Sequence, residues 1–133
     1  MKSKSQIYSD IVFKHIQSFV AENSDEKMVR GYKSLCKRSG GLMRTVGLIQ
    51  FLTFLAAKAT KESEIHHEHL LEHLRLSLDE IGLIRTQDSS DLLSMVRQQS
   101  LADYMRTTNE VLKLLQWHRR IAEILIAGTA EEA

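Results

Sequence analysis

Proline is absent from this sequence of 133 residues, which contains only six glycines and one cysteine. The chain therefore has few residues that break helices or form tight β-turns. The lone Cys36 excludes an internal disulfide framework and fits the reducing environment of the cytoplasm. No apolar segment follows Lys2 and Lys4, so the N-terminus shows no recognisable secretory signal. We therefore expect a cytoplasmic, largely helical protein.

Long uninterrupted apolar runs are also lacking. The most apolar stretch, residues 40–59, is interrupted by polar or charged side chains at Arg44, Thr45, Gln50, Thr53 and Lys58. A bilayer span requires about 18 or more consecutive, predominantly apolar residues, and this stretch does not provide them. Wound at about 100° per residue, it has no single polar face, which is typical of a helix inside a bundle. The stretch thus predicts a core helix.

The spacing of apolar residues predicts helices along almost the whole chain. We expect five to six helices, over about residues 5–22, 25–38, 40–59, 64–79, 91–105 and 107–127. Ser24, Asp88 and the capping-box sequence from Thr107 to Glu110 are the expected helix starts, and Ser39-Gly40-Gly41 is an expected break. The predicted architecture is an all-α, single-domain bundle over residues 1–133, with short flexible ends near residues 1–4 and 129–133.

The small net charge of +1 hides a strong asymmetry along the chain. Residues 1–61 contain eleven Lys and Arg against four Asp and Glu, a balance of +7. Residues 62–133 contain seven against thirteen, a balance of −6. Between Lys27 and Lys61 there are eight basic residues and no acidic one. This pattern indicates either a nucleic-acid-binding surface or a surface for an acidic partner.

Cations on two helices are the candidate binding residues. Five of them share one face of the second predicted helix and span about 16 Å: Lys27, Arg30, Lys33, Lys37 and Arg38. A weaker second set, on the third and last helices, consists of Arg44, Lys58, Arg119 and Arg120. Such side chains suit contact with phosphates, and a solvated basic face explains the same pattern. Trp117, at the border of the last helix, could stack on a base, anchor a protein neighbour, or be a core residue with one exposed edge.

The fourth predicted helix contains a candidate catalytic motif. His69-Leu70-Leu71-Glu72-His73 has the H-x-x-E-H form of inverted zinc peptidases, and His66 lies on the same side. A solvated face rich in Glu and His explains the same residues, and a chain of this length leaves little room for a catalytic cleft. We therefore expect no enzyme activity, no cofactor and no dedicated metal site. Adventitious metal binding by the His66, His69 and His73 face remains an alternative.

Three segments together resemble a known family. They occur in the order YKSLCKRSGGLMRTVGLIQFLTFLAAKA, HHEHLLEHLRLSL and DYMRTTNEVLKLLQWHRRIAEI, and cover about residues 32–124. The chain is similar to the small subunit of the type III-B, or Cmr, CRISPR effector complex, with the small subunit of the III-A, or Csm, complex as the near relative. The matching positions are Tyr32, Lys33, Ser34, Gly47, Leu48, Gln50, Phe54, Leu55, Lys58, Tyr104, Arg106, Thr108, Glu110, Leu114, Leu115, Trp117, Arg120 and Ala122.

The resemblance implies a non-catalytic subunit that acts in antiviral defence. Copies of such subunits stack along the inner face of a ribonucleoprotein filament, beside other Cmr subunits and the duplex of crRNA and target RNA. The candidate cations would then contact RNA phosphates without reading sequence. The alternative is an all-α adaptor whose basic face binds an acidic protein, and a metal-dependent enzyme built on the histidine face is a third hypothesis. The family often has Pro and Asn where this chain has Ser39-Gly40 and Val46.

Overall fold

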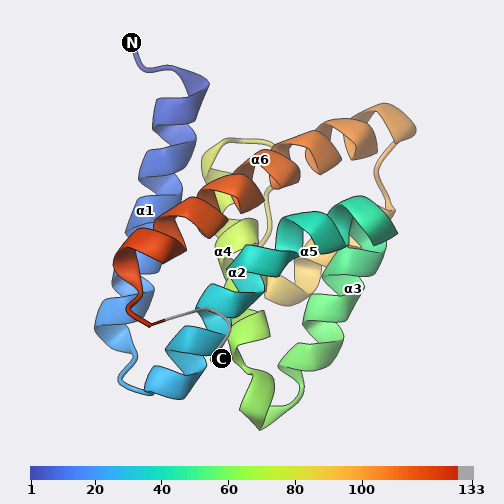
Figure 1. Cartoon of the computed structure of the whole chain (residues 1–133). Helices are drawn as coiled ribbons and strands as arrows, with labels where there is room; N and C mark the ends of the chain where they lie inside the picture. The colour runs from blue at the N-terminus through green and yellow to red at the C-terminus, as the bar shows by residue number, and fades with distance from the viewer. Residues whose placement is uncertain (129–133) are drawn as a thin grey trace.

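Six α-helices and one short 3-10 helix make up the described part of the chain, residues 1–128 of the computed structural model (Figure 1). They are α1 (Lys4–Glu22), α2 (Glu26–Val46), α3 (Leu48–Ala59), η1 (Glu62–Glu64), α4 (His66–Glu80), α5 (Ser89–Arg97) and α6 (Leu101–Leu125). Residues 1–128 include no strand, so the predicted all-α class is confirmed. The flexible end expected at residues 129–133 lies outside the described residues. No helix within residues 1–128 has both the length and the apolar composition needed to cross a membrane.

The core lies where the helices pack around α4. α6 packs against α1 and α2, while α3 packs against α4 and α5 (Figure 1). The apolar face predicted for the fourth helix is buried in full, at Leu70, Leu71, Leu74 and Leu78. These leucines belong to the same core cluster as Tyr32 and Phe51, which are both completely buried. Their burial supplies the main driving force for the bundle.

The predicted break at Ser39-Gly40-Gly41 is wrong, because α2 continues through it to Val46. Glycine inside a helix costs only about 1 kcal/mol relative to alanine, and burial of a side chain such as Met43 outweighs that cost. The chain turns instead at Gly47, whose φ of 87° is easily adopted only by glycine. α3 therefore begins at Leu48, not at residue 40.

The predicted boundary between the last two helices is also wrong. α5 ends at Arg97, and α6 begins at Leu101 after the N-cap Ser100, whose hydroxyl accepts a hydrogen bond from Asp103 N at 3.2 Å. Thr107 does not cap a helix, since it is buried within α6. The N-cap of α2 is Asp25, one residue after the expected Ser24. The predicted cap of the fifth helix, Asp88, is confirmed by its hydrogen bond from Ser90 N at 2.9 Å.

Candidate nucleic-acid interface

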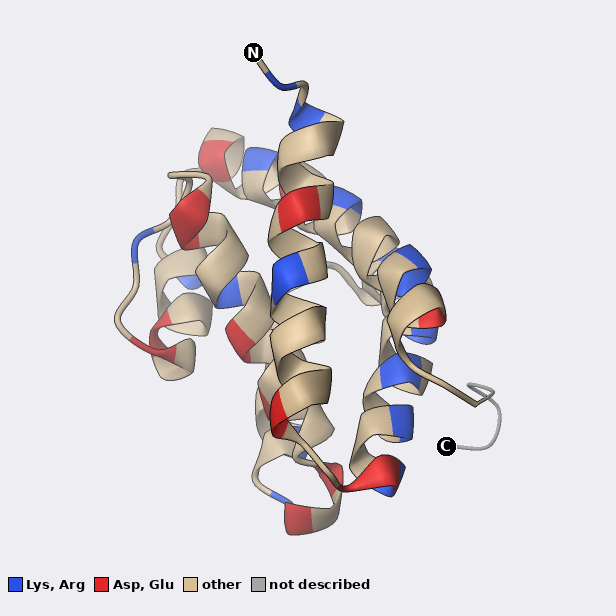
Figure 2. Ribbon diagram, turned by 90° about the vertical axis from the view of Figure 1, so that its left-hand side faces the viewer, with Lys and Arg blue, Asp and Glu red and all other residues tan. Residues whose placement is uncertain are grey.

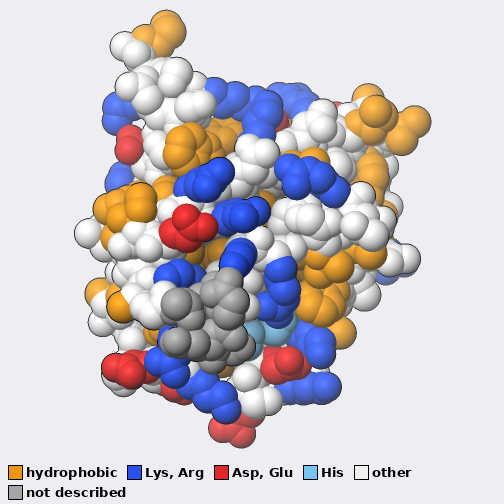
Figure 3. Space-filling view, in the orientation of Figure 1, with side chains coloured by type: hydrophobic (Ala, Val, Ile, Leu, Met, Phe, Trp, Pro, Cys, Tyr) orange, Lys and Arg blue, Asp and Glu red, His pale blue; other side chains and the backbone are white. Residues whose placement is uncertain are grey.

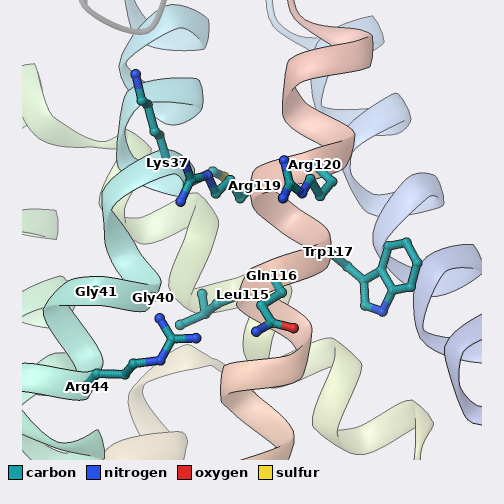
Figure 4. A pocket seen from close by; sticks show the side chains of 10 residues that line it. Lys37, Gly40, Gly41, Arg44, Leu115, Gln116, Trp117, Arg119 and Arg120 are labelled. Atoms are coloured by element: carbon teal, nitrogen blue, oxygen red, sulfur yellow. The ribbon is translucent and has the colours of Figure 1, made fainter.

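A groove between α2 and α6 gathers four of the nine candidate cations. Lys37 and Arg44 line it from α2, and Arg119 and Arg120 line it from α6 (Figure 4). All four side chains are exposed, and the groove has a volume of about 380 Å³. The backbone of residues 40–41 completes the α2 wall. Across the described chain, no Asp or Glu lines this groove.

The continuity of α2 places the two cations of its wall together. Lys37 and Arg44 are seven residues apart, two turns of an uninterrupted helix, so they lie on one face. The helix break predicted from the sequence would have separated them. On α6, Gln116 and Arg119 are three residues apart and face α2 in the same way. Figure 4 shows Arg119 reaching from α6 toward α2 and Arg44 reaching from α2 toward Gln116.

Cations lie on both walls of the groove. Lys and Arg side chains gather over α2 and α6 across the middle of the face shown in Figure 3. The ribbon in Figure 2 marks the positions of Lys and Arg along the helices in blue. Like charges on facing walls raise the local positive potential and favour a polyanion between them. All four cations are candidates identified from the sequence. The sequence did not predict that they line one groove, because α2 and α6 are far apart in the sequence and come together only in the folded protein.

Cys36 and Trp117 also line the groove, but neither is placed to act as a nucleophile or to stack on a base there. Burial raises the pKa of the Cys36 thiol far above its ordinary value, so the sulfur stays protonated and is a poor nucleophile. Trp117 is half-buried and packs against the core. Figure 4 shows its indole pointing away from α2, on the far side of α6 from Arg44. The structure therefore favours the core interpretation of Trp117 over base stacking in this groove.

Lys27 and Arg38 line a different pocket, on the side of α2 that faces η1 and the start of α4. Here the charges are mixed, because Asp25, Glu62 and Glu64 contribute to the same lining. Arg38 also donates a hydrogen bond to Ser34 Oγ at 3.1 Å within α2. This pocket, of about 460 Å³, is consequently less suited to a polyanion than the groove between α2 and α6.

Two other candidate cations form ion pairs away from the groove. Arg30 Nη1 lies 3.7 Å from a carboxylate oxygen of Glu26, one turn earlier in α2. Lys58 Nζ, at the end of α3, lies 3.4 Å from Oε2 of Glu64. Both pairs are at least partly exposed, so each contributes little to stability.

Lys33 lies elsewhere, and the prediction that it shares an exposed face with the other cations of α2 is wrong. Its side chain is buried, and its ammonium donates hydrogen bonds to Ile126 O at 2.9 Å and Gly128 O at 2.5 Å. Both carbonyls belong to the segment that follows the end of α6 at Leu125. The acceptors lie more than 90 residues away in sequence, so no local pattern could have revealed the contact.

The histidines of the α4 motif each contact a different part of the protein. His73 is buried, and its Nδ1 lies 2.5 Å from the hydroxyl of Tyr32 on α2. The ring of His69 packs on Phe19, with 4.9 Å between the centroids, and the ring of His66 packs beside Gly31. Within residues 1–128, no three His, Cys, Asp or Glu side chains are grouped in a way that would hold a metal ion. The motif therefore does not form a shared ligand set.

The fold and the groove define a small all-α protein with a concave cationic surface. The family model described as CRISPR-associated protein (Cas_Cmr5) matches residues 4–125, and the chain belongs to this family. The CRISPR system Cmr subunit Cmr5 of Thermus thermophilus is 26% identical over 127 residues, which cover 95% of this chain and 98% of that protein.

A solved structure gives the same assignment. The X-ray crystal structure of a CRISPR-associated Cmr5 family protein from Thermus thermophilus superposes with a TM-score of 0.74. It is 25% identical in sequence, and the match covers 95% of this chain and 100% of that chain. The resemblance predicted from the sequence, to the small subunit of the type III-B complex, is thereby confirmed.

Proposed function

We propose that this chain is a non-catalytic small subunit of a type III-B CRISPR effector complex and contacts crRNA or target RNA through the α2–α6 groove. The observation that carries the proposal is the meeting of Lys37, Arg44, Arg119 and Arg120 around one concave surface. Membership of the Cas_Cmr5 family supports the assignment to a CRISPR complex. The function is antiviral defence, with RNA bound in the cytoplasm.

The proposed contact is made to the sugar–phosphate backbone. Lys and Arg bind phosphate oxygens without distinguishing bases, and base pairing between guide and target supplies the specificity instead. Trp117 is part of the groove lining, but its indole points away from α2 and is not turned toward a base held between the two helices. Lys27, Arg30, Arg38 and Lys58 are secondary contacts in this proposal, and Lys33 is left out because its ammonium already binds two carbonyl oxygens.

The proposed partners are the other Cmr subunits and further copies of this chain stacked along a filament. The charge asymmetry supports stacking, since the +7 segment of one copy would attract the −6 segment of the next. Association of this kind weakens as salt increases, because exposed charges are screened.

The test is charge reversal in the groove of the assembled complex. We expect Arg119→Glu with Arg120→Glu to weaken binding of a fluorescently labelled target RNA by at least about tenfold, while the complex still assembles. Arg97→Glu is the matched control, because this exposed cation lies on α5, outside the groove. RNA affinity equal to that of the control would contradict the proposal. Salt-sensitive retention of an acidic protein without RNA would favour the adaptor alternative.

A further inference from the structure

One side of α6 combines positive charge with apolar side chains that the described fold leaves uncovered. Its members are seven, four and seven residues apart, so they lie along one side of the helix: Arg106, Lys113, Trp117 and Ile124. We call this set the α6 seam. At about 1.5 Å per residue, it measures about 27 Å from end to end.

Ile124 and Trp117 form the apolar part of the α6 seam. Ile124 is 74% exposed, although its neighbours Ile121 and Ala122 are buried. Trp117 is half-buried, and its indole is turned away from α2 (Figure 4). Tryptophan beside other apolar side chains, with cations at the edge, is typical of the energetic centre of a protein interface.

The other part of the α6 seam carries an excess of positive charge. Lys113 pairs with Glu110, and Lys4 of α1 pairs with the same carboxylate. The side chain of Glu110 is only 10% exposed, whereas those of Lys4 and Lys113 are 54% and 49% exposed. Arg106 is a third exposed cation on this surface. One buried carboxylate therefore faces three cations, and the surface presents about two positive charges to a partner.

The opposite charge gathers where the chain passes from α4 to α5. Residues 79–91 contain one cation, Arg85, and four acids, which are Asp79, Glu80, Asp88 and Asp91. A pocket of about 440 Å³ opens beside them, and its lining includes Asp91 and Met95. Met95 is 43% exposed. We call the four acids and Met95 the acidic corner, which offers negative charge around an apolar side chain.

The α6 seam and the acidic corner belong to different sides of the molecule. In Figure 1, α6 crosses the front of the bundle, and α5 lies behind it, drawn paler with distance. α5 packs against α3 and α4, whereas α6 packs chiefly against α1 and α2. A contact between two different surfaces of this kind joins one copy to the next, and it repeats from copy to copy.

We propose that the α6 seam of one copy docks on the acidic corner of the next copy. Arg106 and Lys113 face the acids, and Ile124 packs beside Met95. Opposite charges set the register of the two copies, and burial of apolar surface supplies the affinity. This inference rests on the proposed function, because it assigns two surfaces to the stacking of copies. It gives Trp117 the role of an anchor for a protein neighbour.

Exchanging the charges of the two surfaces tests the docking, with self-association of the full chain measured by sedimentation velocity at low salt. We expect Arg106→Glu with Lys113→Glu to weaken self-association by at least about tenfold. Glu80→Lys with Asp91→Lys should have the same effect, and Asp88 is left unchanged because it caps α5. A mixture of the two variants should associate again, because each reversed surface then meets its reversed counterpart. Mixed variants that stay as weak as the separate ones would overturn the inference.

The matched control reverses two exposed charges elsewhere. Lys27→Glu with Lys61→Glu changes the net charge as much as the seam variant does and should leave self-association unchanged. Trp117 provides a second readout, because it is the only tryptophan of the chain. Its fluorescence emission should shift to shorter wavelength as the protein concentration increases, since docking removes its exposed edge from water.

Crosslinking in the assembled complex decides the question even where the isolated chain is a monomer. Ile124→Cys with Met95→Cys places one thiol on each surface, while Cys36 is buried and does not compete. A short thiol-reactive crosslinker should join copies into a ladder of dimers and larger multimers, and neither single variant should give this ladder. Absence of the ladder would overturn the inference. Crosslinks from position 124 to a different subunit would also overturn it, because the α6 seam would then face that subunit.

The outcomes separate failure of the docking from failure of the proposed RNA interface. If Arg119→Glu with Arg120→Glu weakens RNA binding and the ladder is absent, the docking is wrong and the RNA interface stands. If the ladder forms and RNA binding is unchanged, the docking stands and the RNA interface falls. If both tests fail, both proposals fall.

Discussion

The ammonium of Lys33 on α2 lies 2.9 Å from the Ile126 carbonyl oxygen, immediately after the end of α6. A second hydrogen bond, to Gly128 O, holds the segment after α6 at two points. The contact fixes the end of α6 against α2, the same two helices that form the groove.

Replacement of Lys33 by Met should therefore lower stability. The methionine fills similar space but leaves two carbonyls without their donor, at a cost of about 1–3 kcal/mol in the free energy of unfolding. Chemical denaturation of the isolated chain measures the change. Lys27→Met is the control, because this exposed lysine should alter stability by no more than about 0.5 kcal/mol. Equal stability of the two variants would show that the Lys33 hydrogen bonds contribute nothing.

Glu110 ties the N-terminal half of α1 to α6 and should make stability depend on acid. Its carboxylate accepts hydrogen bonds from Tyr8 Oη at 2.7 Å and Lys113 Nζ at 3.2 Å, and it pairs with Lys4. Burial alone would raise its pKa, but these three partners outweigh burial and lower the pKa to about 2. The ordinary pKa of a glutamate carboxyl is 4.5. The lowered pKa of Glu110 therefore stabilises the fold fully at pH values above 4.5, and this stabilisation is lost as the pH falls toward 2.

Glu110→Gln should consequently cost about 1–3 kcal/mol at pH 7. Urea denaturation at several pH values measures the difference between wild type and variant. We expect the difference to shrink steadily between pH 4.5 and pH 2, where the wild-type carboxylate becomes protonated. Glu123→Gln, on the exposed face of α6, should show no such trend. A constant gap across this range would contradict the assigned role.

Two buried histidines should make the protein sensitive to milder acid. His73 and His118 meet at Tyr32, whose hydroxyl lies 2.5 Å from Nδ1 of the first and 3.2 Å from Nδ1 of the second. Burial, with lesser repulsion from nearby histidines, lowers the pKa of His73 to about 2 and that of His118 to about 3. Because the unfolded chain then binds more protons, stability is fully present above about pH 6.5 and falls as the pH decreases below it.

A glutamine at position 73 removes one of these titrating groups. We expect His73→Gln to lose stability less steeply than wild type between pH 6.5 and pH 4, by up to about 1.4 kcal/mol per pH unit. Melting temperatures recorded across this range by circular dichroism give both slopes. Parallel curves for wild type and variant would mean that His73 does not contribute to the acid sensitivity.

Sequence patterns predicted the helical class and the core face of α4, because the spacing of Leu70, Leu71, Leu74 and Leu78 depends only on helix geometry. They failed where two local patterns competed. Ser100 and Thr107 are each followed three residues later by an acidic residue, so both fit the pattern of a helix N-cap. Ser100 is the N-cap in the structure, and Thr107 is buried inside α6. The glycines at positions 40 and 41 predicted a helix break that does not occur. Burial of Met43 outweighs the low helix propensity of glycine.

The candidate cations were identified from sequence, but their grouping was not. Lys37 and Arg119 lie on helices separated by more than 50 residues, so only tertiary packing brings them to one groove. The burial of Lys33 could not be predicted for the same reason. Its acceptors are backbone carbonyl groups, which every residue has, so the sequence does not mark them. The sequence therefore indicates which cations are candidates, while the fold decides which of them lie together.

The salt dependence of RNA binding gives an independent measure of the groove. Each phosphate neutralised by a cation releases counterions, so the logarithm of the binding constant falls with the logarithm of salt concentration in proportion to the number of contacts. We expect Arg44→Gln and Arg119→Gln, one on each wall, each to reduce this slope by about 0.7–0.9 in the assembled complex. The reduction should be the same for RNA targets of different sequence, provided that each is paired with its own guide, because backbone contacts do not read bases. Arg97→Gln, on α5, should leave the slope unchanged. A loss of affinity without a change in slope would mean that the two arginines support the shape of the groove and do not contact phosphates.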